Sequence, residues 1–114
     1  MKNPLLLVLA IIGFLFIACN DDDDVEREVT YTDDVSQILN ASCAIPGCHV
    51  SNGNAPFPLE TFEETVAAVG FGRILGAINQ EAGFVAMPFP PGSPKLPETD
   101  IDKITEWIEN GTPE

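Results

Sequence analysis

Apolar residues recur at helical spacing in several short segments, and no segment alternates as a half-buried strand would. The clearest helix is expected to begin at Glu98, where acidic residues form the first turn. Its apolar face consists of Ile101, Ile104, Trp107 and Ile108. Gly111 then stands where a helix typically ends. We therefore expect an amphipathic helix that packs its isoleucines and its tryptophan inward.

Residues 31–42 predict a first helix with a shorter apolar stripe, which consists of Val35, Ile38 and Leu39. Thr32 or Asp33 is the expected N-cap, because short polar side chains accept hydrogen bonds from the free N–H groups of the first turn. This helix leads directly into Cys43, so it would deliver the segment that follows.

Two further helices are expected in the middle of the chain. Thr61 and Glu64 have the spacing of a capping box, and the helix that they open should stop near Gly70. Its apolar side is formed by Phe62, Val66 and Val69. A short helix should follow at residues 73–79. Residues 83–96 contain Pro88, Pro90, Pro91 and Pro94, which exclude a regular helix or a central strand.

Together these segments predict an all-α domain of about three to five short helices over residues 31–114. No stretch of the chain repeats. A domain of this size buries a modest apolar surface and often needs a covalent or metal staple.

Residues 1–18 are expected to be a secretory signal. Lys2 provides a positive start, and the apolar run that follows is shorter than the roughly 20 residues that span a bilayer. The run ends at Phe16-Ile17-Ala18-Cys19, which resembles a bacterial lipobox. We therefore expect lipidation at Cys19 and anchoring to the cell envelope without a spanning segment. The alternative is an ordinary signal peptide with an incidental cysteine.

Residues 19–30 predict an acidic, solvated tether, because a run of four aspartates at residues 21–24 repels itself and hydrates well. By resemblance, an acidic run behind a lipidated cysteine also looks like a signal that sends some Gram-negative lipoproteins to the cell surface. The domain would then lie on the outer face of the outer membrane; otherwise it would lie on the periplasmic side.

The whole chain is strongly acidic, with 5 Lys and Arg against 18 Asp and Glu and a formal net charge of −13. Such a chain has no basic patch for phosphates, which argues against nucleic-acid binding. The same charge favours partner proteins with basic docking surfaces and speeds their encounter in a salt-dependent way.

The chemistry of the chain is concentrated at residues 43–49, where Cys43 and Cys48 lead into the single histidine, His49. Covalent haem attachment usually uses Cys-x-x-Cys-His. Here four residues separate the cysteines. Two thiols must reach the two vinyl groups on one porphyrin edge while the adjacent imidazole reaches the iron, and two extra residues need only bulge outward at Pro46-Gly47. We therefore interpret this segment as a haem c attachment site.

Two other interpretations of this motif remain open. Zinc usually takes four ligands, and Cys43, Cys48 and His49 supply three. A plain disulfide between the two cysteines is chemically easy in an oxidising compartment. The chain has three cysteines, so lipidation of Cys19 would leave this pair and no odd thiol.

Met87 is the candidate second axial ligand. It is the one methionine outside the expected signal, and it follows His49 at a separation sufficient to cross a haem. A thioether is a soft, uncharged ligand that raises the reduction potential of haem iron. Its alternative role is a gap-filling core methionine. Pro56 could offer its carbonyl to the His49 ring, and Arg73 could neutralise a haem propionate, although a turn and a surface arginine are the simpler interpretations.

The chain resembles the small monohaem class I cytochromes c over residues 31–114. The resemblance rests on the attachment motif at residues 43–49, on Met87-Pro88 in a loop rich in glycine and proline, and on the closing helix. It implies an all-α fold around one covalently bound haem, with thioethers at Cys43 and Cys48. It further implies His49 as proximal ligand, Met87 as distal ligand, and first and last helices that cross.

With both axial positions filled by protein, the expected function is electron transfer between redox partner proteins, not catalysis. No second histidine or other catalytic set accompanies the motif. Three alternatives remain: an open-site haem sensor or enzyme if Met87 is not a ligand, an accessory subunit that feeds electrons to a dehydrogenase, and a haem-free, disulfide-stapled binding module.

Overall fold

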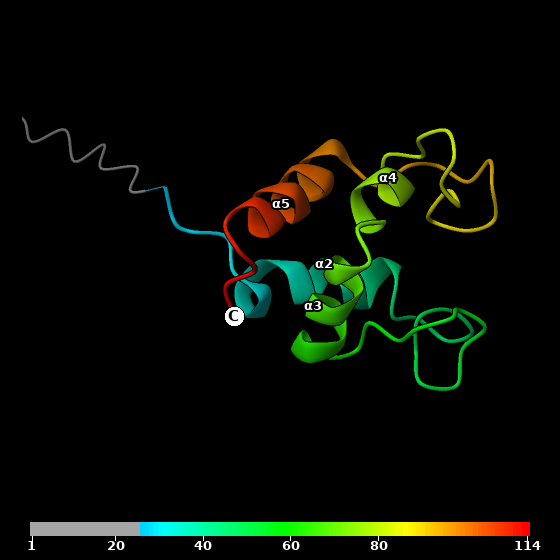
Figure 1. Ribbon diagram of the computed structural model, residues 1–114, viewed down its shortest axis with the longest axis horizontal. Coiled ribbons are helices and arrows are strands. Elements are labelled where there is room, and N and C mark those ends of the chain that lie inside the picture. The colour runs from blue at the N-terminus through cyan, green and yellow to red at the C-terminus, as the bar shows by residue number, and fades with distance from the viewer. Residues whose placement is uncertain (1–25) are drawn as a thin grey trace, which may run out of the picture.

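The computed structural model describes residues 26–114, and this part of the chain is helical without a strand (Figure 1). The elements are a π-helical turn, η1, and four α-helices. Their bounds are η1 Tyr31–Val35, α2 Ser36–Ser42, α3 Phe62–Gly70, α4 Ile74–Ile78 and α5 Glu98–Glu109. The all-α expectation is therefore confirmed for the described residues. The expected signal and the lipidation site at Cys19 lie outside them.

The first helix covers the predicted residues, but its cap is Thr30, two residues before Thr32 and three before Asp33. The Thr30 hydroxyl accepts a hydrogen bond from the Asp33 backbone N–H at 3.3 Å. Thr30 has the extended backbone of an N-cap, whereas Thr32 and Asp33 already lie within the helix. The apolar stripe is confirmed, since Val35, Ile38 and Leu39 are all buried.

The capping box of α3 is confirmed, with the Thr61 hydroxyl bound to the Glu64 N–H and the Glu64 carboxylate bound to the Thr61 N–H. The most buried residues of the helix are Thr65 and Ala68. Thr65 tolerates burial because its hydroxyl donates to the Thr61 carbonyl at 2.8 Å. The predicted apolar side, Phe62, Val66 and Val69, is only partly buried and packs against the edge of the core.

The core lies where α5 packs against η1 and α4. Trp107 is fully buried, and its ring centroid is 6.1 Å from that of Tyr31. The Pro113 carbonyl accepts two hydrogen bonds, from the Trp107 indole at 2.8 Å and from the Tyr31 backbone N–H at 2.9 Å. This carbonyl therefore ties the end of the chain to the first helix.

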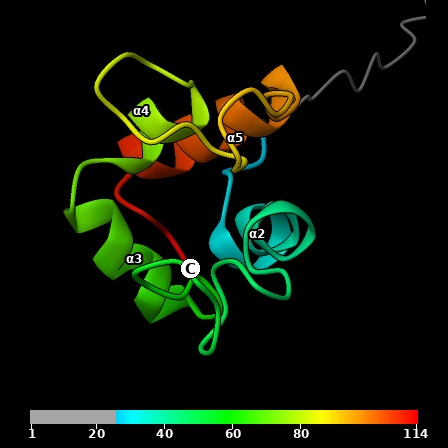
Figure 2. The same cartoon turned by 90° about the vertical axis from the view of Figure 1, so that its right-hand side faces the viewer.

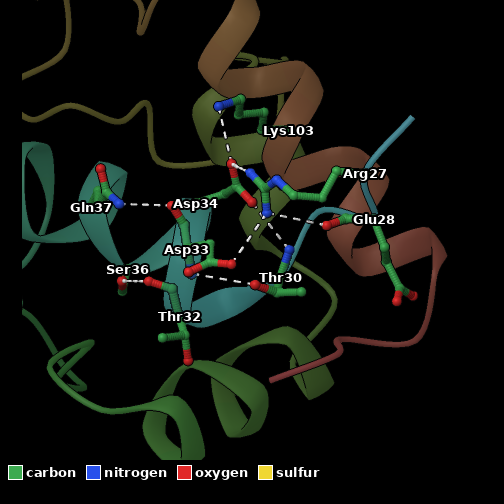
Figure 3. Close-up of polar contacts among 9 residues, drawn as sticks. All are labelled: Arg27, Glu28, Thr30, Thr32, Asp33, Asp34, Ser36, Gln37 and Lys103. Carbon is green, nitrogen blue, oxygen red and sulfur yellow. Dashed lines mark hydrogen bonds and ion pairs between the residues drawn. The ribbon is translucent and has the colours of Figure 1, made fainter. Parts of the chain in front are cut away.

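Residues 27–30, which were expected to belong to the tether, contact the helical part of the chain. Val29 is buried in the core. Arg27 binds Asp34, whose carboxylate is also bound by Lys103 of α5 (Figure 3). Residues 27–30 are held because a buried carboxylate needs hydrogen-bonded, charged partners, and Arg27 is one of them.

Two long connections extend from one end of the molecule, away from the C-terminus (Figure 1). Residues 43–61 leave α2, and residues 79–97 leave α4. Viewed from that end, the first connection lies on the side of α2 and α3, and the second lies on the side of α4 and α5 (Figure 2). The candidate ligands His49 and Met87 thus belong to two connections at the same end.

Candidate functional site

The attachment segment begins where α2 ends. The Cys43 N–H still donates to the Leu39 carbonyl at 2.8 Å, and six residues later the His49 N–H donates back to the Cys43 carbonyl at 3.0 Å. The widened cysteine spacing is therefore closed into a tight loop. Pro46 and Gly47 are exposed, and Gly47 has φ +84°, a conformation that glycine adopts without strain. The extra residues bulge outward as expected.

His49 is buried, with 7% of its surface exposed. Its Nδ1 lies 2.9 Å from the Phe57 carbonyl oxygen. A carbonyl only accepts, so Nδ1 carries a proton, and in the neutral form of the ring Nε2 is then the nitrogen with the lone pair. Within residues 26–114, Nδ1 is the ring nitrogen that makes a hydrogen bond. Nε2 has no hydrogen-bond partner among these residues, so it could serve as a metal ligand.

The carbonyl that orients His49 belongs to Phe57 and not to Pro56, which is exposed. The path of the chain after residue 57 explains why the Phe57 carbonyl meets the ring. The Leu59 N–H donates to the His49 carbonyl at 2.9 Å, which aligns residue 57 with the ring. The sequence offered no signal for this residue, because every residue has the same backbone carbonyl, whatever its side chain is.

Two further contacts hold the loop around His49. The Ser51 N–H donates to the Glu60 carboxylate at 2.8 Å, and the Ser51 hydroxyl binds the same carboxylate. Gly53 lies against the Cys48 backbone so closely that a Cβ there would be 1.7 Å from the Cys48 carbonyl oxygen. Gly53 is therefore required for the close approach that keeps Cys48 in place.

Cys43 and Cys48 are free thiols and half-buried. Burial, and to a lesser extent repulsion by a charged Cys48, raise the pKa of the Cys43 thiol to about 11. Since the thiolate is the form that attacks a disulfide or binds a metal, Cys43 is a poor nucleophile in this fold. Within the described residues no group of three His, Cys, Asp or Glu is placed to hold a metal ion, so the zinc interpretation has no ligand set there.

Met87 is half-buried, and both polar groups of its backbone are bound. Its N–H donates to the Ala77 carbonyl at 3.0 Å, and its carbonyl accepts from the Gln80 side chain at 3.3 Å. The end of α4 therefore fixes the position of Met87 within the second connection. Gln80 was not among the residues that the sequence singled out.

Arg73 binds within its own part of the chain. Its guanidinium carbon lies 5.2 Å from the centroid of the Phe84 ring, and its Nη2 is 3.4 Å from the Gly83 carbonyl. Phe84 in turn covers Gly76, where a Cβ would come within 2.6 Å of the ring. Arg73 is exposed, so it stays available to a carboxylate ligand.

The described surface carries apolar groups that the sequence did not predict to be exposed. The large exposed side chains are Phe71, Val85 and Phe89, and the last two flank Met87 in the chain. A small open hollow of about 100 Å³ lies among α3, α4 and α5, lined by Val69, Gly72, Ile74, Leu75 and Ile108.

Comparison of the chain with protein-family models, with curated proteins and with solved structures finds no match. Within residues 26–114, no helix is both long and apolar enough to cross a bilayer.

Proposed function

We propose that this protein is an electron carrier that holds one haem c through Cys43 and Cys48, with His49 and Met87 as axial ligands. The observation that carries the proposal is the state of His49. The imidazole is buried and its Nδ1–H is bound to a backbone carbonyl, which is how metal-binding histidines are commonly oriented so that Nε2 can bind the metal. The Phe57 carbonyl fixes both the tautomer and the plane of the ring.

The donor set fits haem better than it fits the alternatives. A free thiol pair beside a histidine suits two thioether bonds and one axial bond. The high pKa of the Cys43 thiol leaves little thiolate at neutral pH, which slows attack by this sulfur on a disulfide in the folded chain. Met87 is held by its backbone in a connection at the same end as His49, which suits a second axial ligand (Figure 1).

The bound haem would supply a one-electron Fe(II)/Fe(III) couple. The chain's part is then to occupy both axial positions and to exclude other ligands, which favours transfer of electrons over catalysis. The net charge of −13 supports docking to basic redox partners. Lipidation of Cys19 would hold the carrier at the cell envelope, on the periplasmic side or at the outer surface.

The first test is expression of the full chain in a bacterium that matures cytochromes c. We expect the denatured polypeptide to stain for haem peroxidase activity and to carry the added mass of one haem. A Cys43→Ser/Cys48→Ser double variant should lose both signals. The matched control is Cys19→Ser, which removes a cysteine outside the motif and should keep the haem while releasing the protein from the membrane fraction.

The spectra separate the carrier from an open-site haem protein. We expect a low-spin spectrum in both oxidation states, reversible reduction, and no rapid binding of carbon monoxide at neutral pH. Rapid binding would instead indicate a sensor or enzyme with an open axial position. A colourless, matured protein, with its mass accounted for by polypeptide and lipid, would leave the disulfide-stapled binding module and refute the electron carrier.

A further inference from the structure

Gln80 has an unusual backbone for its residue type. It lies two residues after the end of α4 and has φ +56°, in the left-handed region that residues other than glycine seldom adopt. A residue in this region costs free energy, so the surrounding contacts must hold it there. The contacts of Gln80 show what the conformation achieves.

The side chain of Gln80 joins two distant points of the following loop. Its Nε2 donates to the Met87 carbonyl at 3.3 Å and to the Ser93 carbonyl at 3.1 Å. The backbone N–H of Met87 donates to the Ala77 carbonyl at 3.0 Å. Met87 is thus held from both sides by residues at the end of α4, and one amide group closes the loop from residue 87 to residue 93.

We propose that Gln80 is the positioning residue for Met87, and that its amide keeps the thioether in place against displacement by small ligands. This inference rests on the proposed role of Met87 as an axial ligand. A neutral Met87–iron bond is weak, so the occupancy of the axial position depends on how rigidly the chain holds the methionine.

The geometry sets the size of the effect. Loss of two neutral hydrogen bonds shifts a local equilibrium by about tenfold or more. The fraction of molecules in which Met87 has moved away should rise by the same factor. Because carbon monoxide can bind only those molecules, its rate of binding to the ferrous protein should rise in proportion.

The test uses the haem-loaded full chain with Gln80→Glu, which has nearly the same shape but no N–H to donate. The matched control is Asn79→Asp, an equal change of charge one residue earlier; the Asn79 side chain binds the Leu75 carbonyl at 2.9 Å within the helix end. Gln80→Gly is the second variant. Glycine adopts φ +56° without strain, so this variant removes the amide together with the rest of the side chain but does not add backbone strain.

We expect carbon monoxide to bind both Gln80 variants at least about tenfold faster than it binds the wild type. The reduction potential of the haem should be lower in both variants. The rate of carbon monoxide binding to Asn79→Asp should stay within about twofold of the wild-type rate. Wild-type rates in both Gln80 variants, or an equal rise in Asn79→Asp, would overturn the proposal. Met87→Ala distinguishes this failure from that of the proposed function. If Met87→Ala leaves the spectrum and the rate unchanged, methionine ligation itself is wrong; if it alone raises the rate, Gln80 has no positioning role.

Discussion

Replacement of Asp34 by asparagine tests how the first helix is joined to the last. The Asp34 carboxylate is buried and accepts hydrogen bonds from Arg27 at 2.9 Å, from Lys103 at 3.1 Å and from the Thr30 N–H at 3.3 Å (Figure 3). Asparagine has almost the same shape but no charge. Its amide oxygen could still accept from Arg27 and Lys103, but without the charge attraction, and its NH2 group cannot accept from the Thr30 N–H. The substitution therefore removes the attraction while leaving the packing nearly unchanged.

The magnitude follows from the exposure of the partners. Hydrogen bonds to charged groups contribute about 1.5–3 kcal/mol each, whereas breaking a fully buried ion pair costs about 3–5 kcal/mol. Arg27 and Lys103 have side chains that are 58% and 49% exposed, so both regain water when the carboxylate is lost. We therefore expect the free energy of unfolding to fall by about 2–3 kcal/mol, at or below the lower limit of the range for fully buried pairs.

The assay is thermal unfolding of the haem-loaded protein, followed by far-ultraviolet circular dichroism. A loss of this size lowers the Tm of a small domain by about 10 °C or more. The control is Asp33→Asn, since the neighbouring Asp33 side chain is 65% exposed and reaches Arg27 only at 3.4 Å. An exposed pair contributes at most about 1 kcal/mol, so this variant should unfold close to the wild type.

The pH dependence gives a second readout. Burial alone would raise the pKa of Asp34, but hydrogen bonds from Arg27, Lys103 and Thr30 outweigh it and lower the pKa below its usual value. A carboxylate whose pKa is lowered on folding stabilises the protein at pH values above its unfolded-state pKa of about 3.9. This stabilisation is lost as the pH falls through the folded-state pKa. The gap between wild type and Asp34→Asn should therefore close below about pH 4.

The reasoning would be refuted if Asp34→Asn were no less stable than Asp33→Asn at pH 7. A difference in stability that persisted unchanged at pH 2 would refute the electrostatic explanation and leave only a packing effect.

Two further substitutions test the loop and the core. Gly53→Ala should lower the Tm of the haem-loaded protein, because the new Cβ would collide with the Cys48 carbonyl, a backbone group that cannot move aside. The control is Gly70→Ala, since no atom lies within 4 Å of a Cβ at that position. Equal Tm values for the two variants would contradict the close approach of Gly53 to Cys48. Trp107→Phe should cost about 2–3 kcal/mol of unfolding free energy in chemical denaturation, because it opens a gap in the core and removes the indole donor to Pro113. A cost below about 1 kcal/mol would show that this hydrogen bond contributes little.

The helices could be predicted because their signals are local. The capping box at Thr61 and the spacing of Ile101, Ile104 and Trp107 each lie within a few turns of one helix, and the structure confirms both. The predicted cap of the first helix was wrong by two or three residues, because a local signal cannot choose among several neighbouring residues that can all act as caps. Thr30, Thr32 and Asp33 are all good caps in isolation, and the packing of Val29 in the core selects the first.

The candidate site was predictable only in part. The residue types that carry chemistry, Cys43, Cys48, His49 and Met87, are rare in the chain and stand out in the sequence. Their partners do not stand out. The Phe57 carbonyl and the Gln80 amide act through groups that many residues possess, so their roles depend on which residue the chain brings into contact.

Residue identity and spacing along the chain were enough to predict which short segments are helical and which side chains are candidate ligands for a cofactor. The contacts of residues 27–30, the carbonyl that orients His49 and the amide that holds Met87 depend on the tertiary fold. These contacts join residues through backbone groups or buried charges. Backbone groups are the same at nearly every position, so the three-dimensional path of the chain alone can choose among them.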